Sequence, residues 1–447
     1  MITFLSTISI RYKSLALLAI LTIGLESFAQ TNSVSPYSRF GFGERYPISN
    51  ARYLGMGGAS LALPDGLNIN FSNPASYHSL ELTTFNVGFE GSFIRQEQEN
   101  PAISIINNRS GMRNLSVGVP LYDWWGSAIA LKPYSFKGYE ISSTRTVSND
   151  PNESITDVFT GEGGLNSVVW GNSFRVAEGL SLGINFNYLF GSLRESTVVD
   201  FSDFTFLDTR SEQESLISGV FFNYGMRYHY KMANDKFIAL AATFQNSSGL
   251  NATNTDFQYT LNGLQARDTL IGGTTNEGEF TLPSEFGFGL SYGKQIENAL
   301  QAAWAINLDY ETYNGSEFSS PLTFNPLSDG YKAEIGGFFT PRYSFKSLER
   351  GTGFFNNTEY RFGAFYEKTP ITLSATDLYN YGITFGLGLP IRQRNLAPGE
   401  YKVSTLNIGI MAGRRGTFEN NLIREEYISF FVAVTFNDKW FIEYKYR

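Results

Sequence analysis

The residues best suited to chemistry are a serine between two glycines and a pair of histidines. Residues 289–293 read Gly-Leu-Ser-Tyr-Gly, the spacing of a nucleophile elbow, in which a strand-to-helix turn exposes the serine. Here apolar residues alternate through the motif and no helical pattern follows, so Ser291 belongs to a strand. His78 and His229 are the two histidines, and no spacing pairs either with a nucleophile. The motif therefore does not predict acyl-transfer chemistry.

The residues that build metal and thiol sites are also scarce. The chain contains no cysteine, which excludes thiol catalysis, a disulfide scaffold and an acyl-cysteine anchor. No His spacing matches a zinc site. Residues 149–153, Asn-Asp-Pro-Asn-Glu, could hold Ca²⁺ weakly, but a solvated turn is the commoner interpretation. We expect no enzymatic activity, no metal and no cofactor.

The N-terminus carries the features of an export signal. Arg11 and Lys13 precede an apolar run over residues 15–25, and Ser-Phe-Ala at 27–29 is a small-x-small cleavage site. This run is too short for a transmembrane helix, and no later segment offers about 18 consecutive apolar residues. We therefore expect residues 1–29 to be a signal peptide and the protein to be exported.

Composition narrows the fold class to two alternatives. Aromatic residues make up 16% of the chain, glycines number 44, and charged residues are 17%, below the roughly 25% of ordinary soluble domains. The net charge is −8 and no basic patch suggests a nucleic-acid partner. An exported, aromatic-rich and cysteine-free chain fits an outer-membrane β-barrel, or a large soluble β-sandwich or propeller.

Alternation along the chain favours the barrel. In residues 379–390, apolar residues at odd positions face away from Gly, Asn and Thr, and residues 180–190, 299–311 and 428–436 repeat the pattern. The second face is rich in Gly, Ser and Asn rather than Lys and Glu, as expected for a crowded lumen. The fold class predicted is all-β: a transmembrane antiparallel barrel of about fourteen strands with both termini in the periplasm.

This pattern divides the chain into four parts. The predicted parts are a signal peptide (1–29), an N-terminal extension (30–80), the barrel (81–436) and a short periplasmic tail (437–447). Longer linkers rich in Asn, Asp, Ser, Thr and Gly are expected to be extracellular loops: 141–163, 251–278, 313–329 and 391–402.

The inferred lumen face contains several charged residues. Such charges can hydrate a pathway, or pair across strands and stiffen the wall, and structural pairing is the favoured interpretation. None is assigned as a ligand contact. They are Glu285, Asp309, Glu311, Glu359, Arg361 and Glu367.

The N-terminal extension contains a segment with no clean strand or helix period. Residues 54–77 read LGMGGASLALPDGLNINFSNPASY, with turn signals at Pro64-Asp65-Gly66 and at Asn73-Pro74. Small residues permit close packing against backbone, so the segment could lie inside a lumen or lead into the first strand. Its hatch or gate candidates are Gly55, Gly57, Gly58, Asp65, Asn73, Pro74 and Ala75.

This combination of a barrel and a Gly-rich segment ending in Asn-Pro-Ala resembles the FadL-like family of outer-membrane transporters. Residues 35–41, Ser-Pro-Tyr-Ser-Arg-Phe-Gly, also look like the mature start of Bacteroidota members. The resemblance implies that the segment folds as a hatch inside the barrel. It also implies passage of long-chain fatty acids or other hydrophobic small molecules across the outer membrane of a Gram-negative bacterium.

The same resemblance leaves a second function open. PorV-like relatives are non-transporting subunits of type IX secretion, so the barrel could instead serve a larger outer-membrane secretion or assembly complex. The expected partners are then outer-membrane lipid, a hydrophobic ligand, or other outer-membrane proteins. A continuous pocket reaching the hatch would favour transport, and an occluded lumen in a stable complex would favour the subunit role.

Overall fold

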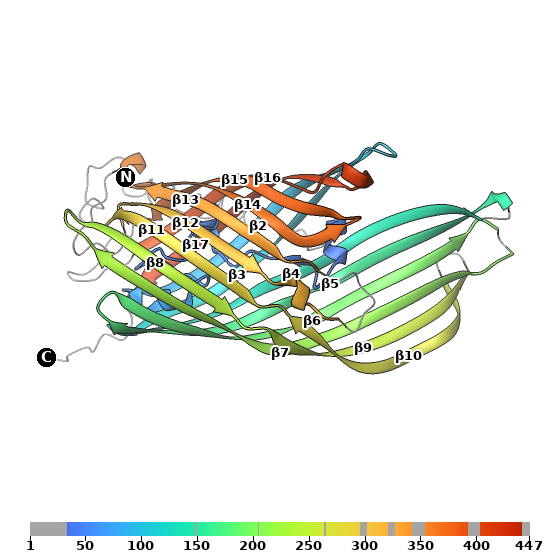
Figure 1. Cartoon of the computed structure of the whole chain (residues 1–447), viewed down its shortest axis with the longest axis horizontal. Coiled ribbons are helices and arrows are strands. Elements are labelled where there is room, and N and C mark those ends of the chain that lie inside the picture. Colours follow the sequence, from blue (N-terminus) through green and yellow to red (C-terminus); the bar gives the residue numbers. More distant parts are fainter. Residues whose placement is uncertain are drawn as a thin grey trace, which may run out of the picture. The chain divides into compact units, whose positions relative to one another are not determined.

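The computed structural model describes residues 34–147, 150–203, 205–262, 265–295, 302–320, 327–341, 354–391 and 403–439. The contacts between residues divide the chain into two units. Residues 1–31 lie outside the described part, and residues 32–447 form the barrel unit. Within that unit every strand pairs antiparallel with its neighbours, and β17 pairs with β2 to close the wall (Figure 1).

The barrel strands follow one another up and down the wall. They are β2 (Thr83–Gln98), β3 (Ile103–Tyr122), β4 (Trp125–Val147), β5 (Asp150–Ala177), β6 (Leu180–Phe201), β7 (Asp208–Lys231), β8 (Lys236–Gln245), β9 (Ser248–Asn262), β10 (Gln265–Leu282), β11 (Glu285–Lys294), β12 (Trp304–Tyr313), β13 (Gly330–Phe339), β14 (Glu359–Leu373), β15 (Thr376–Ile391), β16 (Val403–Arg415) and β17 (Arg424–Asp438).

Two wall strands are interrupted at the same level. Because β7 pairs with both β8 and β9, these two lie end to end as one strand. On the other side of this strand, β11 pairs with β8 and β10 pairs with β9, so β10 and β11 also lie end to end as one strand. Pro283, which has no N–H for the ladder, lies at the β10–β11 break. Counted as continuous strands, the wall is a closed barrel of fourteen, as the alternation predicts.

Alternation places apolar side chains outward. On β12, Ile306, Leu308 and Tyr310 are exposed, whereas Asn307 and Asp309 are buried. An apolar outer band with an inner face of small and polar residues is the pattern of a membrane barrel. In the described part of the chain, none of the helices is long and apolar enough to cross a membrane.

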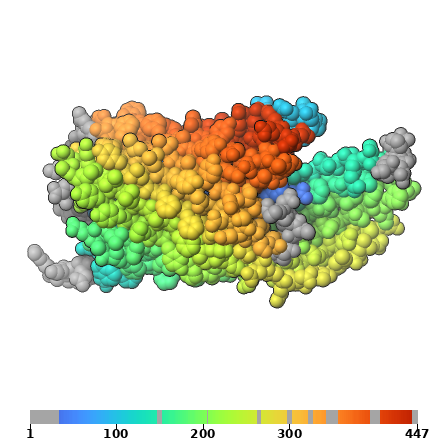
Figure 2. Space-filling view, viewed as in Figure 1, coloured from blue at the N-terminus to red at the C-terminus, as the bar shows by residue number. Residues whose placement is uncertain are grey.

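One side of the wall is much taller than the other. The hairpins β4–β5, β6–β7 and β9–β10 continue well past the ends of β12, β13 and the β14–β15 turn (Figures 1 and 2). We call the projecting part, residues 140–163, 191–215 and 251–280, the tall wall.

The tall wall corrects the expected loops. Residues 141–163 and 251–278 are almost entirely strand rather than loop. Beyond the lipid both faces of a strand meet water, so the alternation that reveals a strand disappears. The linker 391–402 is also among the expected extracellular loops. It connects β15 to β16 at the end of the barrel opposite the β14–β15 turn and the 313–329 loop, so it cannot lie on the same side as they do. Residues 392–402 themselves lie outside the described residues.

The inner segment (residues 34–80) is built of short elements. They are η1 (Pro36–Arg39), β1 (Glu44–Arg45), α2 (Ala51–Leu54) and η2 (Pro74–Ser79). β1 pairs with β4, and nearly all of residues 50–77 are buried among residues of the surrounding wall. The remaining short helices are η3 (Gly315–Glu317), η5 (Phe354–Asn357) and η6 (Glu419–Asn421).

Candidate functional site

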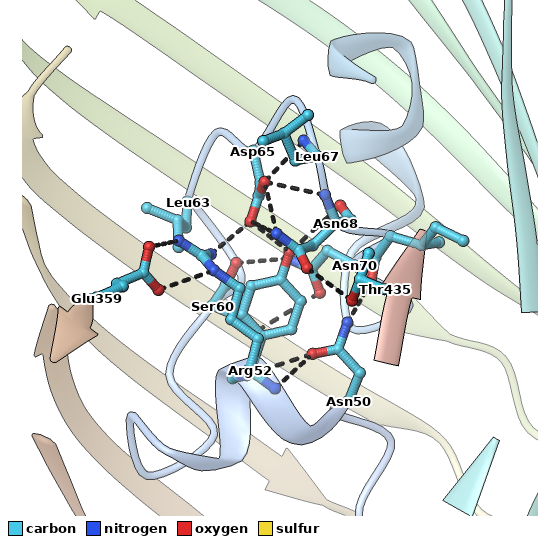
Figure 3. A network of polar contacts seen from close by, with 12 residues as sticks. Asn50, Arg52, Ser60, Leu63, Asp65, Leu67, Asn68, Asn70, Glu359 and Thr435 are labelled. Atoms are coloured by element: carbon cyan, nitrogen blue, oxygen red, sulfur yellow. Dashed lines mark hydrogen bonds and ion pairs between the residues drawn. The ribbon is translucent and has the colours of Figure 1, made fainter. Parts of the chain in front are cut away.

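The inner segment is tied to the wall by a buried arginine. Arg52, 2% exposed, lies on α2 and donates from Nε and Nη2 to the two carboxylate oxygens of Glu359 on β14, each at 3.1 Å. Its Nη1 also pairs with Asp65 (Figure 3). Burial alone would lower the pKa of Arg52, but the carboxylates of Asp65 and Glu359 raise it above its usual value. The guanidinium is therefore a fixed cation between two carboxylates.

Glu359 extends this network along the wall. Arg361 Nε donates to Glu359 Oε1 at 2.6 Å, and Arg361 Nη2 donates to Asn407 Oδ1 at 2.7 Å. Both residues are buried, so the carboxylate accepts from two arginines in a site closed to water. The lumen charges predicted at Glu359 and Arg361 thus form an ion pair with each other, and Arg52 of the inner segment also pairs with Glu359.

Asp65 also organises the backbone of its own turn. Its Oδ1 accepts from the backbone N–H of Leu67 and of Asn68, each at 3.0 Å. At the other end of the network, Asn50 caps α2, since its side-chain oxygen accepts from the N–H of Arg52 at 3.0 Å. The short helix and the Asp65 turn therefore present Arg52 and Asp65 to each other (Figure 3).

The glycines lie where the inner segment touches the wall. Gly57 and Gly58 have φ of +74° and +104°, a conformation that favours glycine. A Cβ on Gly57 would lie 2.8 Å from the carbonyl oxygen of Ala364, and one on Gly58 would lie 2.4 Å from a carboxylate oxygen of Glu334. A Cβ on Gly55 would lie 3.1 Å from the Cα of Gly386. No larger side chain fits at 57 or 58 without movement of the wall or the segment.

The Asn-Pro-Ala triplet forms a second contact, at the start of η2. The amide of Asn73 donates to Leu61 O at 2.8 Å and to Met226 O at 3.3 Å, and its oxygen accepts from Ala75 N at 2.9 Å. Ala75 O accepts from the Ser173 hydroxyl at 2.9 Å. Pro74 packs so tightly on β6 that a Cβ on Gly183 would lie 2.3 Å from its carbonyl carbon.

Asp309 holds the turn between these contacts. Its Oδ2 accepts from Ser60 N at 2.5 Å and from Leu61 N at 2.8 Å. Asp309 faces Glu334 across the β12–β13 ladder. The wall therefore presents three carboxylates to the inner segment: Glu359, and the facing pair Asp309 and Glu334.

The remaining lumen charges surround a cavity of about 280 Å³ between the first half of the inner segment and the wall. Glu285 pairs with Arg45 of β1 at 2.6 Å, and Glu367 accepts from Asn380 at 2.9 Å. Glu311 also lines the cavity and faces Lys332 across the ladder. The described lining is rich in charged residues and tyrosines.

An apolar cluster lies just inside the two interrupted strands. Leu250 of β9 and Phe280 of β10 pack with Phe42 of the inner segment and with Phe318, and the ring centroids of Phe42 and Phe280 are 5.4 Å apart. The other members are Tyr134, Leu165, Leu189, Leu193, Ile217, Phe221, Ala252, Leu282, Tyr313 and Leu327.

Sequence reasoning missed Arg52, the residue that joins Asp65 of the inner segment to Glu359 of the wall. Its partner Glu359 is more than 300 positions away in the chain, and no local pattern links them. The available signal was a lone arginine in an otherwise apolar and small-residue stretch, which needs a buried partner. Ser291 of the Gly-x-Ser-x-Gly string lies in β11, fully buried, with Asn307 accepting from its hydroxyl.

Comparison with known families identifies the chain. The family model described as BamG matches residues 11–447. The chain belongs to the BamG family. No curated protein matches it.

Solved structures share the fold of this BamG-family chain. A FadL homologue from Pseudomonas aeruginosa superposes with a TM-score of 0.54 at 12% identity, covering 89% of this chain and 100% of that one. The toluene transporter TodX from Pseudomonas putida gives 0.54 at 14% identity, with the same coverages. The toluene transporter TbuX from Ralstonia pickettii gives 0.52 at 12% identity, again over 89% and 100%. The fold is thus that of the FadL-type barrels.

Proposed function

We propose that this chain is an outer-membrane barrel of a Gram-negative bacterium that binds hydrophobic small molecules and lets them pass its wall. The observation that carries the proposal is the apolar cluster placed directly inside two interrupted neighbouring strands. Apolar side chains with a few polar groups at their border are the usual lining of a site for an apolar ligand. TodX and TbuX, which share the fold, are toluene transporters, which supports this substrate class.

In this proposal the inner segment is the gate. Its candidate residues Gly57 and Asn73 lie at contacts between the segment and the wall, and Asp65 pairs with Arg52, which is itself bound to Glu359 of the wall. A solute that has entered the cluster would leave when these contacts loosen.

Filling the cluster tests the proposal. Ala252, 3% exposed, belongs to the cluster, so Ala252→Trp would place a bulky ring where a ligand would contact these side chains. We expect this variant to lose most uptake of radiolabelled toluene and laurate in cells that depend on the barrel. Ile238→Trp, on the exposed outer face, is the matched control and should transport normally. Equal uptake by both variants would contradict a route through the cluster.

A second function is favoured by a separate observation, the buried ion pairs of Arg52. Opening the gate would separate Arg52 from Glu359 or from Asp65 in a site closed to water, which is costly. A permanently closed barrel would suit a subunit of an outer-membrane secretion or assembly complex, as in the PorV-like barrels of Bacteroidota. Stoichiometric copurification with other outer-membrane proteins after mild detergent extraction, with no bound hydrophobic ligand, would support this function over transport.

A further inference from the structure

The net charge of the tall wall is more negative than that of the whole protein. Its three hairpins contain 15 Asp and Glu but four Lys and Arg, a net charge of −11, whereas the full chain has −8. The four arginines are already paired: Arg145 with Asp157, Arg194 with Glu162 and Glu214, Arg210 with Glu212, and Arg267 with Asp268. The remaining carboxylates give this part of the molecule a strong negative field.

On β6 and β7 the tall wall extends past the apolar outer band, whereas Leu270 and Ile271 on β10 are exposed apolar residues. The large exposed hydrophobic residues of β6 end at Tyr188, and those of β7 end at Leu216. Beyond these positions the exposed side chains of the same strands are polar, such as Arg194 and Asp200. At roughly 3.3 Å per residue, β6 continues ~43 Å past Tyr188 to Phe201, and β7 extends ~26 Å from Leu216 to Asp208, along the strand direction.

The border of the tall wall is an open strand edge. β10 pairs with β9 along its whole length. On its other side, within the described residues, one bridge joins Thr281 to Ser319, and nothing pairs with residues 265–279 (Figure 1). Three register shifts distort β10 before Thr274, but from Thr274 to Glu279 the strand is regular.

Such an edge is a template for a further strand. Unpaired N–H and C=O groups in a regular edge accept an extended segment, and natural proteins usually block this with proline or bulges. Residues 274–279 contain no proline, and Thr274, Thr275, Asn276, Glu277 and Glu279 are exposed. The surrounding charge decides which segment can approach.

We propose that the tall wall docks a basic partner protein, which adds a positively charged strand to the β10 edge. A second copy of this chain would bring another tall wall with a net charge of −11 and would be repelled. An anionic lipid surface would be repelled for the same reason. A strand bearing Lys or Arg would form main-chain hydrogen bonds with β10, and its side chains would meet Glu277, Glu279 and the carboxylates of neighbouring hairpins. This docking does not depend on whether the barrel transports.

The test uses the full chain in detergent micelles and three fluorescent eight-residue peptides. The first alternates lysine and valine, the second has glutamate in place of lysine, and the third is the lysine peptide with alternate backbone amides N-methylated. Anisotropy should show binding of the first alone, and hydrogen exchange should slow at residues 274–279. Equal binding of the N-methylated peptide, or protection elsewhere in the barrel, would overturn the proposal.

Charge variants complete the test. Glu140, Asp200, Glu277 and Glu279 are exposed and make no ion pair among the described residues. Changing all four to the corresponding amides should weaken the lysine peptide about tenfold and flatten its salt dependence. The control removes two carboxylates at the opposite end, Glu81→Gln with Glu178→Gln, and should bind normally. Undiminished binding by the fourfold variant would also contradict the docking.

Discussion

At the scale of single residues, Arg52 and Glu359 hold the inner segment in the lumen. Removing one partner of a buried ion pair leaves the other charge without compensation, which typically costs about 3–5 kcal/mol. Glu359→Gln would leave Arg361 without its carboxylate partner, and would leave Arg52 with Asp65 alone and no charged contact with the wall. We therefore expect the backbone amides of residues 50–77 to exchange hydrogen much faster in this variant.

The control is an exposed pair of the same type. Arg414 and Glu426 lie 2.7 Å apart with side chains 43% and 38% exposed, so Arg414→Gln should change stability by at most about 1 kcal/mol. Exchange of the inner segment should match the parent protein. If Glu359→Gln also left exchange unchanged, the ion pairs would not be what holds the segment.

His78, next to the Asn-Pro-Ala triplet, predicts a pH effect. Burial and the nearby Arg227 lower its pKa from 6.5 to about 3. The unfolded chain therefore binds a proton near pH 6.5 while the folded protein does not, so stability falls as the pH drops from 6.5 towards 3. The slope due to His78 is at most about 1.4 kcal/mol per pH unit.

Urea unfolding between pH 7 and pH 4 measures this slope. His78→Gln keeps a polar side chain that does not titrate, and its stability should depend less on pH than that of the parent protein. Identical pH profiles of the two proteins would show that protonation of His78 does not lower the stability.

At the scale of elements, the turn at Gly57 and Gly58 fixes the distance between the inner segment and β14. Gly57→Ala would place a methyl group 2.8 Å from Ala364 O in a backbone conformation that disfavours it, and Gly57 N also donates to Thr384 at 2.8 Å. We expect looser seating of the segment, seen as faster proteolysis within residues 50–77. Gly91→Ala, whose Cβ would meet nothing closer than 3.8 Å, is the matched control. Equal proteolysis of the two variants would show that the close contact at Gly57 does not hold the inner segment against β14.

The elements also show what the sequence can predict. Alternation predicted a barrel of about fourteen strands, which the structure confirms, because lipid and lumen impose opposite demands on successive residues. It missed the tall wall, since most of the outward-facing residues of those hairpins are polar and strict alternation is lost there. It could not predict the Arg52–Glu359 contact, because such pairing follows from barrel closure rather than from local pattern. Pro283 does mark one break in the wall.

At the scale of the whole molecule, the barrel combines a closed wall, a firmly seated inner segment and an apolar cluster at the level of the interrupted strands. Transport requires the segment to move, whereas a structural subunit does not. Because the chain has no cysteine, a single engineered disulfide can separate these functions.

The most direct measurement is uptake by the Gly55→Cys, Gly386→Cys variant. A Cβ on Gly55 would lie 3.1 Å from the Cα of Gly386, so the two cysteines would be adjacent, and a small outward movement of the inner segment would give the spacing that a disulfide to β15 needs. If the segment is the gate for hydrophobic molecules, toluene and laurate uptake should stop when the disulfide forms and return on reduction, while each single-cysteine variant transports under both conditions. Undiminished uptake by the oxidised protein would contradict the gate.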